Sequence, residues 1–166
     1  MTFENDTTVG VILAINSPGG SPVKPGEMYD EIMRLREAHP DTPIYAVAAG
    51  VCASGGYYVA AAAQKIYANK ASIIGSIGVR TDRFGFEDAM AKLGITRRLY
   101  ASGDSKGFWI LPAAQAGGCS AFESVLDEIH RQFITAVRQG RGERLRETPN
   151  CLAVWYGPGP RVWNWA

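Results

Sequence analysis

The apolar positions of this chain form short runs and helical stripes that alternate along the sequence. Val9 to Ile15 and Ile44 to Ala49 are nearly unbroken apolar runs, which is typical of strands buried on both faces of a parallel sheet. Between them, from Met28 to Leu35, apolar residues recur at helical spacing, so we expect a helix that ends near Pro40. The chain therefore begins as strand, helix, strand.

The alternation continues beyond the second run. An alanine-rich helix is expected to begin near Ser54. It is followed by a strand at Lys65 to Ala68, a small-residue segment at Gly75 to Val79, a helix around Phe84 to Leu93 and a strand at Thr96 to Tyr100. This order predicts an α/β fold with a mainly parallel sheet, right-handed crossovers and helices on its faces. Sites in such folds gather at the carboxyl ends of strands.

The strongest helical period lies late in the chain, from about Ser120 to Gln139. Its apolar stripe consists of Phe122, Val125, Leu126, Ile129, Phe133 and Val137. A stripe of this width is buried when the protein folds or assembles. We expect this face to lie in the core or in a subunit contact.

Composition fits one globular domain. The 166 residues are 46% hydrophobic and 20% charged, with a formal net charge of +1, which gives no electrostatic reason to expect nucleic acid as a partner. The late chain is locally basic, through Arg131, Arg138, Arg141, Arg144 and Arg146. We interpret these arginines as a solvated helix face.

Cysteines and the N-terminus give no sign of metal, disulfide or membrane. Cys52, Cys119 and Cys151 form no CxxC or Cys/His cluster, so neither a zinc site nor a disulfide framework is expected. Met1 to Thr8 is polar and unlike a secretory signal, and no apolar run approaches the roughly 20 residues that span a bilayer. The chain as given is expected to be soluble, in a compartment that the sequence leaves unknown.

Ser54 is the candidate nucleophile. It lies where the strand-like run gives way to the alanine-rich helix, between Gly50 and the pair Gly55 and Gly56. Glycines permit a sharp turn and close approach of a substrate carbonyl, and the start of a helix supplies free N–H groups. The alternative is that Ser54 only caps the helix, because serine is a preferred cap residue.

A serine nucleophile needs a base. His39 lies beside a proline and His130 lies inside the late helix, so both are expected in packing or in solvent. Among the lysines, Lys65 is about 16 Å from Ser54 along the expected helix, and Lys92 falls in a surface-like helix. Lys24 and Lys70 suit exposed turns.

Lys106 has a different setting. It lies in the small-residue loop Ala101 to Gly107, which leads into Phe108 and Trp109, and aromatic neighbours can dehydrate an amine and lower its pKa. The alternative is an exposed lysine paired with Asp104. An oxyanion would also need two donors, for which Gly19 and Gly55 are natural sources, although Gly19 could equally serve a plain tight turn.

Four motifs in a fixed order carry a family resemblance. They are Asn-Ser-Pro-Gly-Gly at 16–20, Ala-Ser-Gly-Gly-Tyr-Tyr at 53–58, Gly-Ser-Ile-Gly-Val at 75–79 and Ser-Gly-Asp-Ser-Lys at 102–106. Together they resemble the signal peptide peptidase A family of serine peptidases, from about Val9 to Gly142. The resemblance implies the Clp protease/crotonase-like ββα superfold, which agrees with the alternation of elements.

The resemblance also implies roles for individual residues. Ser54 would be the nucleophile, Lys106 the general base, and Gly19 and Gly55 the oxyanion donors. An acyl-enzyme on Ser54 would be hydrolysed by water, with no metal or cofactor. The implied partners are a peptide or protein substrate and further copies of the chain in a homo-oligomer.

Family context supplies the remaining expectations. The family cleaves signal peptides and other membrane-derived or unfolded segments, and a phage branch processes capsid proteins. It is usually associated with the bacterial inner membrane, so membrane association here would come only through an anchor missing from this sequence or through partners.

Two departures from the family pattern shape the expected domain organisation. Only eight mostly polar residues precede Val9, and no resemblance is found in the Trp-, Pro- and Gly-rich end of the chain. We therefore expect a peptidase domain over 1–142, incomplete at its N-terminus, and a divergent tail over 143–166. The tail is interpreted as the product of a truncated or frame-altered gene, with an aromatic docking tail as the alternative.

The leading functional hypothesis is thus an endopeptidase with a Ser54/Lys106 dyad. The rival is a non-catalytic fragment or assembly subunit of such a peptidase. A third hypothesis uses the same superfold for acyl-CoA chemistry, with the glycine N–H groups holding an enolate, but acid/base carboxylates in suitable loops are not evident.

Overall fold

The structure is a computed structural model of the whole chain. It describes residues 3, 5, 7–82, 84–96, 98, 100, 102 and 118–145, with side chains in the last range from residue 122. The chain divides into two compact units, residues 1–78 with 129–166 and residues 79–128. Ser54 and its surroundings lie in the first unit.

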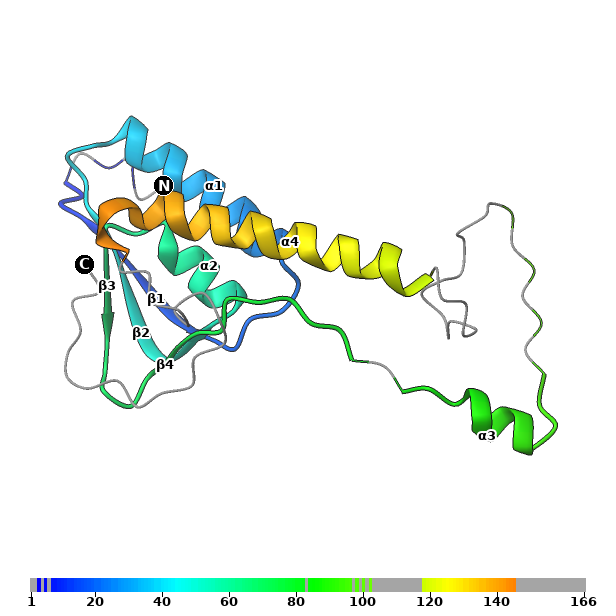
Figure 1. Cartoon of the computed structure of the whole chain (residues 1–166). Helices are drawn as coiled ribbons and strands as arrows, with labels where there is room; N and C mark the ends of the chain where they lie inside the picture. Colours follow the sequence, from blue (N-terminus) through cyan, green and yellow to red (C-terminus); the bar gives the residue numbers. More distant parts are fainter. Residues whose placement is uncertain are drawn as a thin grey trace. The chain divides into compact units, whose positions relative to one another are not determined.

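A parallel sheet forms the base of the first unit (Figure 1). Its strands are β1 (Val11–Ser17), β2 (Ile44–Ala53), β3 (Lys65–Ala68) and β4 (Ile73–Gly75). β2 pairs with β1 on one side and with β3 and then β4 on the other, and all three pairings are parallel. The expected α/β fold with a mainly parallel sheet is confirmed.

Two strand boundaries differ from the expectation. The first strand begins and ends two residues later than Val9 and Ile15. β2 continues past Ala49 to Ala53 because its last residues, Val51 to Ala53, pair with β4. β4 has only three residues, so it is too short to give an apolar pattern of its own.

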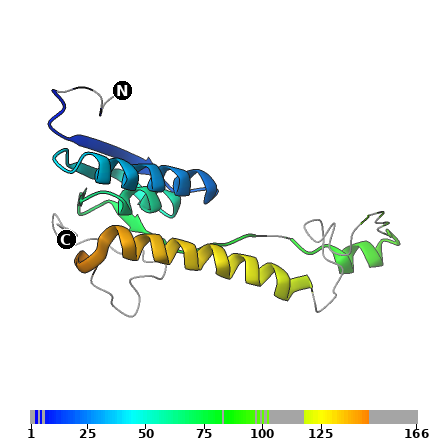
Figure 2. The same cartoon turned by 90° about the horizontal axis from the view of Figure 1, so that it is seen from above.

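Three helices of the first unit lie on one face of the sheet (Figures 1 and 2). They are α1 (Val23–Ala38), the short α2 (Gly55–Ala61) and the second half of α4 (Gly118–Arg141), which is followed by the 3-10 turn η2 (Gly142–Arg144). On the opposite face Ile12 of β1 is 68% exposed, so the prediction that the first strand is buried on both faces is wrong for the described residues. α1 ends at Ala38, with His39 as its C-cap residue, close to Pro40 as expected, since a proline disfavours helical conformation in the residue before it.

The second unit contains α3 (Glu87–Lys92), which is shorter than the expected helix. Of the strand expected at Thr96 to Tyr100, the structure describes Thr96, Arg98 and Tyr100, and none of these three lies in a strand. Arg97 and Leu99 lie outside the described residues. α4 begins in this unit and is two residues longer at each end than expected.

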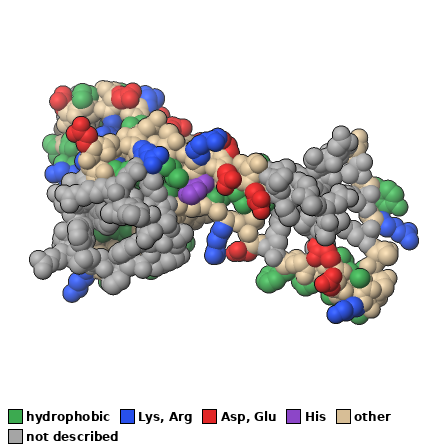
Figure 3. Space-filling model, in the orientation of Figure 1, with side chains coloured by type: hydrophobic (Ala, Val, Ile, Leu, Met, Phe, Trp, Pro, Cys, Tyr) green, Lys and Arg blue, Asp and Glu red, His purple; other side chains and the backbone are tan. Residues whose placement is uncertain are grey.

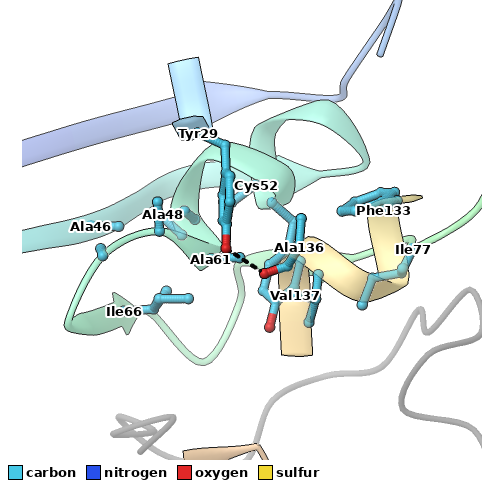
Figure 4. Close-up of a cluster of buried hydrophobic side chains, with 14 residues drawn as sticks. Tyr29, Ala46, Ala48, Cys52, Ala61, Ile66, Ile77, Phe133, Ala136 and Val137 are labelled. Atoms are coloured by element: carbon cyan, nitrogen blue, oxygen red, sulfur yellow. Dashed lines mark hydrogen bonds between the residues drawn. The ribbon is translucent and has the colours of Figure 1, made fainter. Parts of the chain in front are cut away.

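The core of the first unit is formed by small residues of β2 and α2 beneath aromatic rings of α1 and α4 (Figure 4). The Tyr29 hydroxyl donates a hydrogen bond of 2.7 Å to the Ala136 carbonyl. The Tyr58 ring stacks on Phe133, with ring centroids 4.6 Å apart. Phe133 and Val137 are buried here, so this part of the expected stripe lies in the core.

Three arginines bind the carbonyl groups at the C-terminal end of α2. Arg36 Nη1 donates to Ala62 O at 2.6 Å, Arg141 Nη1 donates to Ala63 O at 2.7 Å, and Arg144 Nη1 donates to Gln64 O. Cations stabilise this end of a helix. Burial lowers the pKa of the Arg36 and Arg141 guanidinium groups, and the neighbouring arginines lower each pKa further.

The solvated face expected for the late arginines is therefore wrong for Arg141, which is only 2% exposed. Its guanidinium group donates to the backbone carbonyl of Ala63, and a backbone acceptor cannot be recognised from a pattern of side chains. Elsewhere Lys and Arg alternate with Asp and Glu on the face shown in Figure 3. In the described ranges, no helix is long and apolar enough to cross a membrane.

Candidate active site

Ser54 forms the turn between β2 and α2. Its backbone angles are φ 52° and ψ −121°, and positive φ is unfavourable for a residue with a side chain. Among the described non-glycine residues, only Ser54 and Ser76 have positive φ. The turn places Ser54 at the carboxyl end of a parallel strand and at the start of a helix, where sites of α/β folds are found.

The Ser54 hydroxyl does not cap α2. Ser54 occupies the N-cap position, yet its side chain makes no capping hydrogen bond. The backbone instead is held on both sides: Ser54 N–H donates to Gly75 O at 2.7 Å, and Tyr58 N–H donates to Ser54 O at 2.9 Å. The capping alternative thus does not account for the serine side chain.

Gly19 lies directly against Ser54, although 35 residues separate them in sequence. A Cβ atom on Gly19, whose φ is +103°, would lie 2.5 Å from Ser54 Cβ, 2.9 Å from Ser54 Oγ and 3.0 Å from Gly55 N. The structure therefore brings Ser54 together with Gly19 and Gly55. Only a residue without a side chain fits where Gly19 lies.

The two glycine N–H groups differ in their hydrogen bonds. Gly55 N–H is at the first position of α2 and has no acceptor within the described part of the chain. Gly19 N–H donates to Ser17 Oγ at 3.1 Å. Gly55 N–H could therefore donate to an oxyanion bound here without losing another hydrogen bond. Gly19 N–H could donate to it only by sharing its hydrogen bond with the Ser17 hydroxyl or by giving that bond up.

The segment after β4 borders the same turn. Gly75 and Ser76 have φ of 102° and 55°, and the next residue, Ile77, is buried. His130 Nε2 lies 3.2 Å from Ile77 O and donates to it, because a carbonyl oxygen can only accept. His130 is thus a packing residue, as expected, and it fixes this segment to α4.

The lysine part of the site is only partly described. Lys24, Lys65, Lys70 and Lys92 are all exposed, and Lys24 pairs with Glu27 at 2.7 Å. An exposed amine lacks the dehydrated setting that a lysine base requires. Lys106 and its alternative partner Asp104 lie outside the described residues, so the role of Lys106 stays a prediction.

Cys52, two residues before Ser54, is expected to be chemically inert in the folded protein. It is wholly buried, and burial raises the pKa of its thiol from 9.0 to about 12. The thiol therefore stays protonated in the fold while it ionises in the unfolded chain, so the free energy of unfolding decreases as pH rises from 9.0 towards 12. Iodoacetamide at pH 9 should modify Cys52 only after denaturation, as followed by peptide mass spectrometry. Rapid modification of the native chain at this residue would contradict the expectation.

Comparison with known proteins assigns the family. The model of peptidase family S49 matches residues 36–157. The chain is 37% identical over 103 residues, 62% of this chain and 29% of the relative, to a putative signal peptide peptidase SppA of Enterococcus faecium. It is 39% identical over 92 residues, 55% of this chain and 13% of the relative, to the chloroplastic serine protease SPPA of Arabidopsis thaliana.

A third relative has a different name. The chain is 33% identical over 159 residues, 95% of this chain, to a protein of Brucella melitensis named Na(+)/H(+) antiporter NhaA, but the match covers 21% of that protein. The chain spans less than a third of the length of each of these three relatives. The family match agrees with the parallel sheet and with the strand-to-helix turn at Ser54. This chain belongs to peptidase family S49, the SppA-like peptidases with the Clp protease/crotonase-like fold.

Proposed function

We propose that this chain is a serine peptidase in which Ser54 is the nucleophile and Lys106 the general base. The observation that carries the proposal is the turn at Ser54: a serine with φ 52° whose hydroxyl does not cap the helix that it begins. Gly19 and Gly55 lie against this serine. Strain of this kind is found where function requires a fixed side chain.

The proposed reaction follows the logic of acyl transfer. The neutral amine of Lys106 takes the proton of the Ser54 hydroxyl as Oγ attacks the carbonyl carbon of the substrate. The carbonyl oxygen gains charge and accepts hydrogen bonds from Gly19 N–H and Gly55 N–H. The lysine ammonium then protonates the leaving amine, and an acyl-enzyme remains on Ser54. Water, deprotonated by the same amine, hydrolyses it.

Lys106 is proposed on two grounds. It is the lysine of the segment Ser102 to Lys106, which resembles the base-bearing segment of the family. In addition, the other lysines, at positions 24, 65, 70 and 92, are exposed, whereas a lysine base must be dehydrated or lie near other cations to be neutral at physiological pH.

We further propose the substrates and the assembly that the family resemblance implies. The substrates would be signal peptides or other membrane-derived or unfolded segments, consistent with the name of the Enterococcus faecium relative. The active form would be a homo-oligomer. The domain limits of 1–142 and 143–166 also stay proposals, and we note that the family match runs on to residue 157.

A fluorophosphonate probe tests the dyad. The wild-type chain should be labelled at Ser54, and Ser54→Ala should lose the label. Lys106→Ala should be labelled at least roughly a hundredfold more slowly, because proton removal by a positioned base contributes about 10²- to 10⁴-fold. Lys70→Ala is the matched control, since Lys70 is exposed, and it should be labelled at the wild-type rate. Labelling rates are measured by intact-mass spectrometry, and the labelled serine by peptide mapping.

Two outcomes would count against the proposal. Labelling that persists in Ser54→Ala would remove Ser54 as the nucleophile. A wild-type chain that neither reacts nor hydrolyses casein-like peptides would favour the rival, a non-catalytic fragment or assembly subunit. A mixing experiment tells whether Ser54 and Lys106 pair within one subunit or between two. An equimolar mixture of Ser54→Ala and Lys106→Ala chains should regain labelling only if the serine and the lysine come from neighbouring subunits.

A further inference from the structure

We propose that Asn16 is a positioning residue for Ser54, an inference that rests on the peptidase function proposed above. The side-chain oxygen of Asn16 holds a bulge in β2, and this bulge directs the last residues of the strand into the turn at Ser54. Asn16 is also the second-to-last residue of β1, just before the loop that carries Gly19. A single side chain thus joins the loop that carries Ser54 and Gly55 to the loop that carries Gly19.

The bulge is visible in the register of the two strands. Ile15 of β1 pairs with Ala48 of β2, but Ser17 pairs with Cys52. The chain advances two residues along β1 and four along β2 between these pairs, so β2 carries two extra residues opposite Asn16. Extra residues of this kind bend a strand and re-aim the side chains that follow, and they are frequent beside active sites.

The bulge is also the point at which β2 changes its neighbour on the other side. Before it, Tyr45 to Ala48 pair with β3. After it, Val51 to Ala53 pair with β4. Neither β3 nor β4 pairs with Ala49 or Gly50, and β1 pairs with no residue from Ala49 to Val51. The backbone groups that face β1 in the bulge therefore need other partners.

Asn16 supplies such a partner. Val51 N–H donates to Asn16 Oδ1 at 3.1 Å, across 35 residues of sequence. Gly50 leaves room for this contact, because a Cβ atom on Gly50 would lie 3.1 Å from the same oxygen. Beyond Val51, β2 pairs with β4 as far as Ala53, and Ser54 N–H donates to Gly75 O at 2.7 Å. Asn16 therefore holds the start of the paired segment that ends in the turn at Ser54.

The position of this segment matters because the space at Ser54 is so small. Gly19 and Ser54 approach so closely that a single added carbon would not fit between them. Release of the bulge would let the Ser54 loop move relative to the Gly19 loop, and a displacement of about 1 Å is enough to slow a positioned reaction by roughly a hundredfold. Asn16 itself is exposed, so packing in the core does not explain why an asparagine occurs at this position.

The test compares three changes in the full chain. Asn16→Leu keeps the size of the side chain and removes the acceptor. Asn16→Asp keeps an acceptor for Val51 N–H. Asn5→Leu is the matched control, because Asn5 Oδ1 likewise accepts a backbone N–H, that of Thr7 at 3.0 Å, in a turn that precedes β1.

Two measurements are made on each variant: the rate of fluorophosphonate labelling at Ser54, and amide hydrogen exchange at Val51 by NMR. In Asn16→Leu, labelling should slow at least roughly tenfold and Val51 exchange should accelerate at least roughly tenfold. Asn16→Asp should retain the protection of Val51 and label faster than Asn16→Leu. Asn5→Leu should match the wild type in both measurements.

A second variant keeps the test decisive if Asn16→Leu fails to fold. In Gly50→Ala the new Cβ atom would crowd Asn16 Oδ1. The labelling rate and the Val51 exchange rate should change in the same direction as in Asn16→Leu, by a smaller factor. Wild-type labelling in Asn16→Leu, or slow labelling with Val51 still protected, would overturn the proposal. If the wild-type chain does not react at all, the peptidase proposal fails separately, and unchanged Val51 exchange in Asn16→Leu would still overturn the role of Asn16.

Discussion

Gly140→Ala is expected to lower the free energy of unfolding by about 3 kcal/mol, because overpacking of a rigid contact costs this much. At Gly140, α4 lies against the backbone of α2. A Cβ atom there would overlap Ala61 O, and it would lie 2.9 Å from Ala61 C and 3.1 Å from Tyr29 Cε2. Backbone atoms cannot rotate away as a flexible side chain can, so α4 would have to move off α2.

Urea unfolding followed by circular dichroism measures this effect. The matched control is Gly26→Ala in α1, where a Cβ atom would meet nothing within 4 Å. This variant should be stabilised by about 0.5–1 kcal/mol through the higher helix propensity of alanine. Equal unfolding midpoints for Gly140→Ala and Gly26→Ala would show that the α2–α4 contact is looser than described.

Gly19→Ala is expected to slow fluorophosphonate labelling at Ser54 by roughly a hundredfold or more, because it displaces the reacting groups. The new Cβ atom would lie 2.5 Å from Ser54 Cβ and 2.9 Å from Ser54 Oγ. Either the serine turn or the Gly19 loop must move, and both the proposed nucleophile and a proposed oxyanion donor are then displaced. The cost in stability should be smaller, since the loop is at the surface.

Gly20→Ala separates this clash from backbone strain. Gly20 also has positive φ, +152°, but a Cβ atom there would meet nothing within 4 Å. Its labelling rate should stay within a few-fold of the wild type if contact with Ser54 is what matters. Equal rates for Gly19→Ala and Gly20→Ala would mean that the space beside Ser54 is not limiting.

The order of strands and helices could be predicted because each element of useful length carries its own period. β3 was predicted with its observed bounds, whereas β4 could not be, since three residues give no period. The same limit affected β2: its last residues are recognisable as strand only through their pairing with β4. Which residues of the late apolar stripe are buried also depends on packing, since Phe133 is buried whereas Val125 is 46% exposed.

The candidate site was only partly accessible to sequence reasoning. Ser54 could be found from its place between strand and helix, and Gly19 from the tight turn after Pro18. That Gly19 touches Ser54 follows from the parallel pairing of β1 with β2, which no local pattern encodes. Two further features could not be predicted for the same reason: the hydrogen bond from Val51 N–H to Asn16 and the burial of Arg141. In both, the side chain bonds to a backbone group distant in sequence.

The hydrogen bond from Tyr29 to Ala136 joins residues 107 positions apart, and this separation has a consequence during synthesis. Ribosomes add about 5–20 residues per second, so roughly 5 to 20 s pass between the two residues. Once α2 has been synthesised, its alanine surface and the Tyr29 and Tyr58 rings have no α4 to cover them for the rest of this interval. The nascent chain therefore exposes an apolar surface that chaperones can bind, and the C-terminal end of α2 gains its last two arginine partners only when Arg141 and Arg144 have left the ribosome.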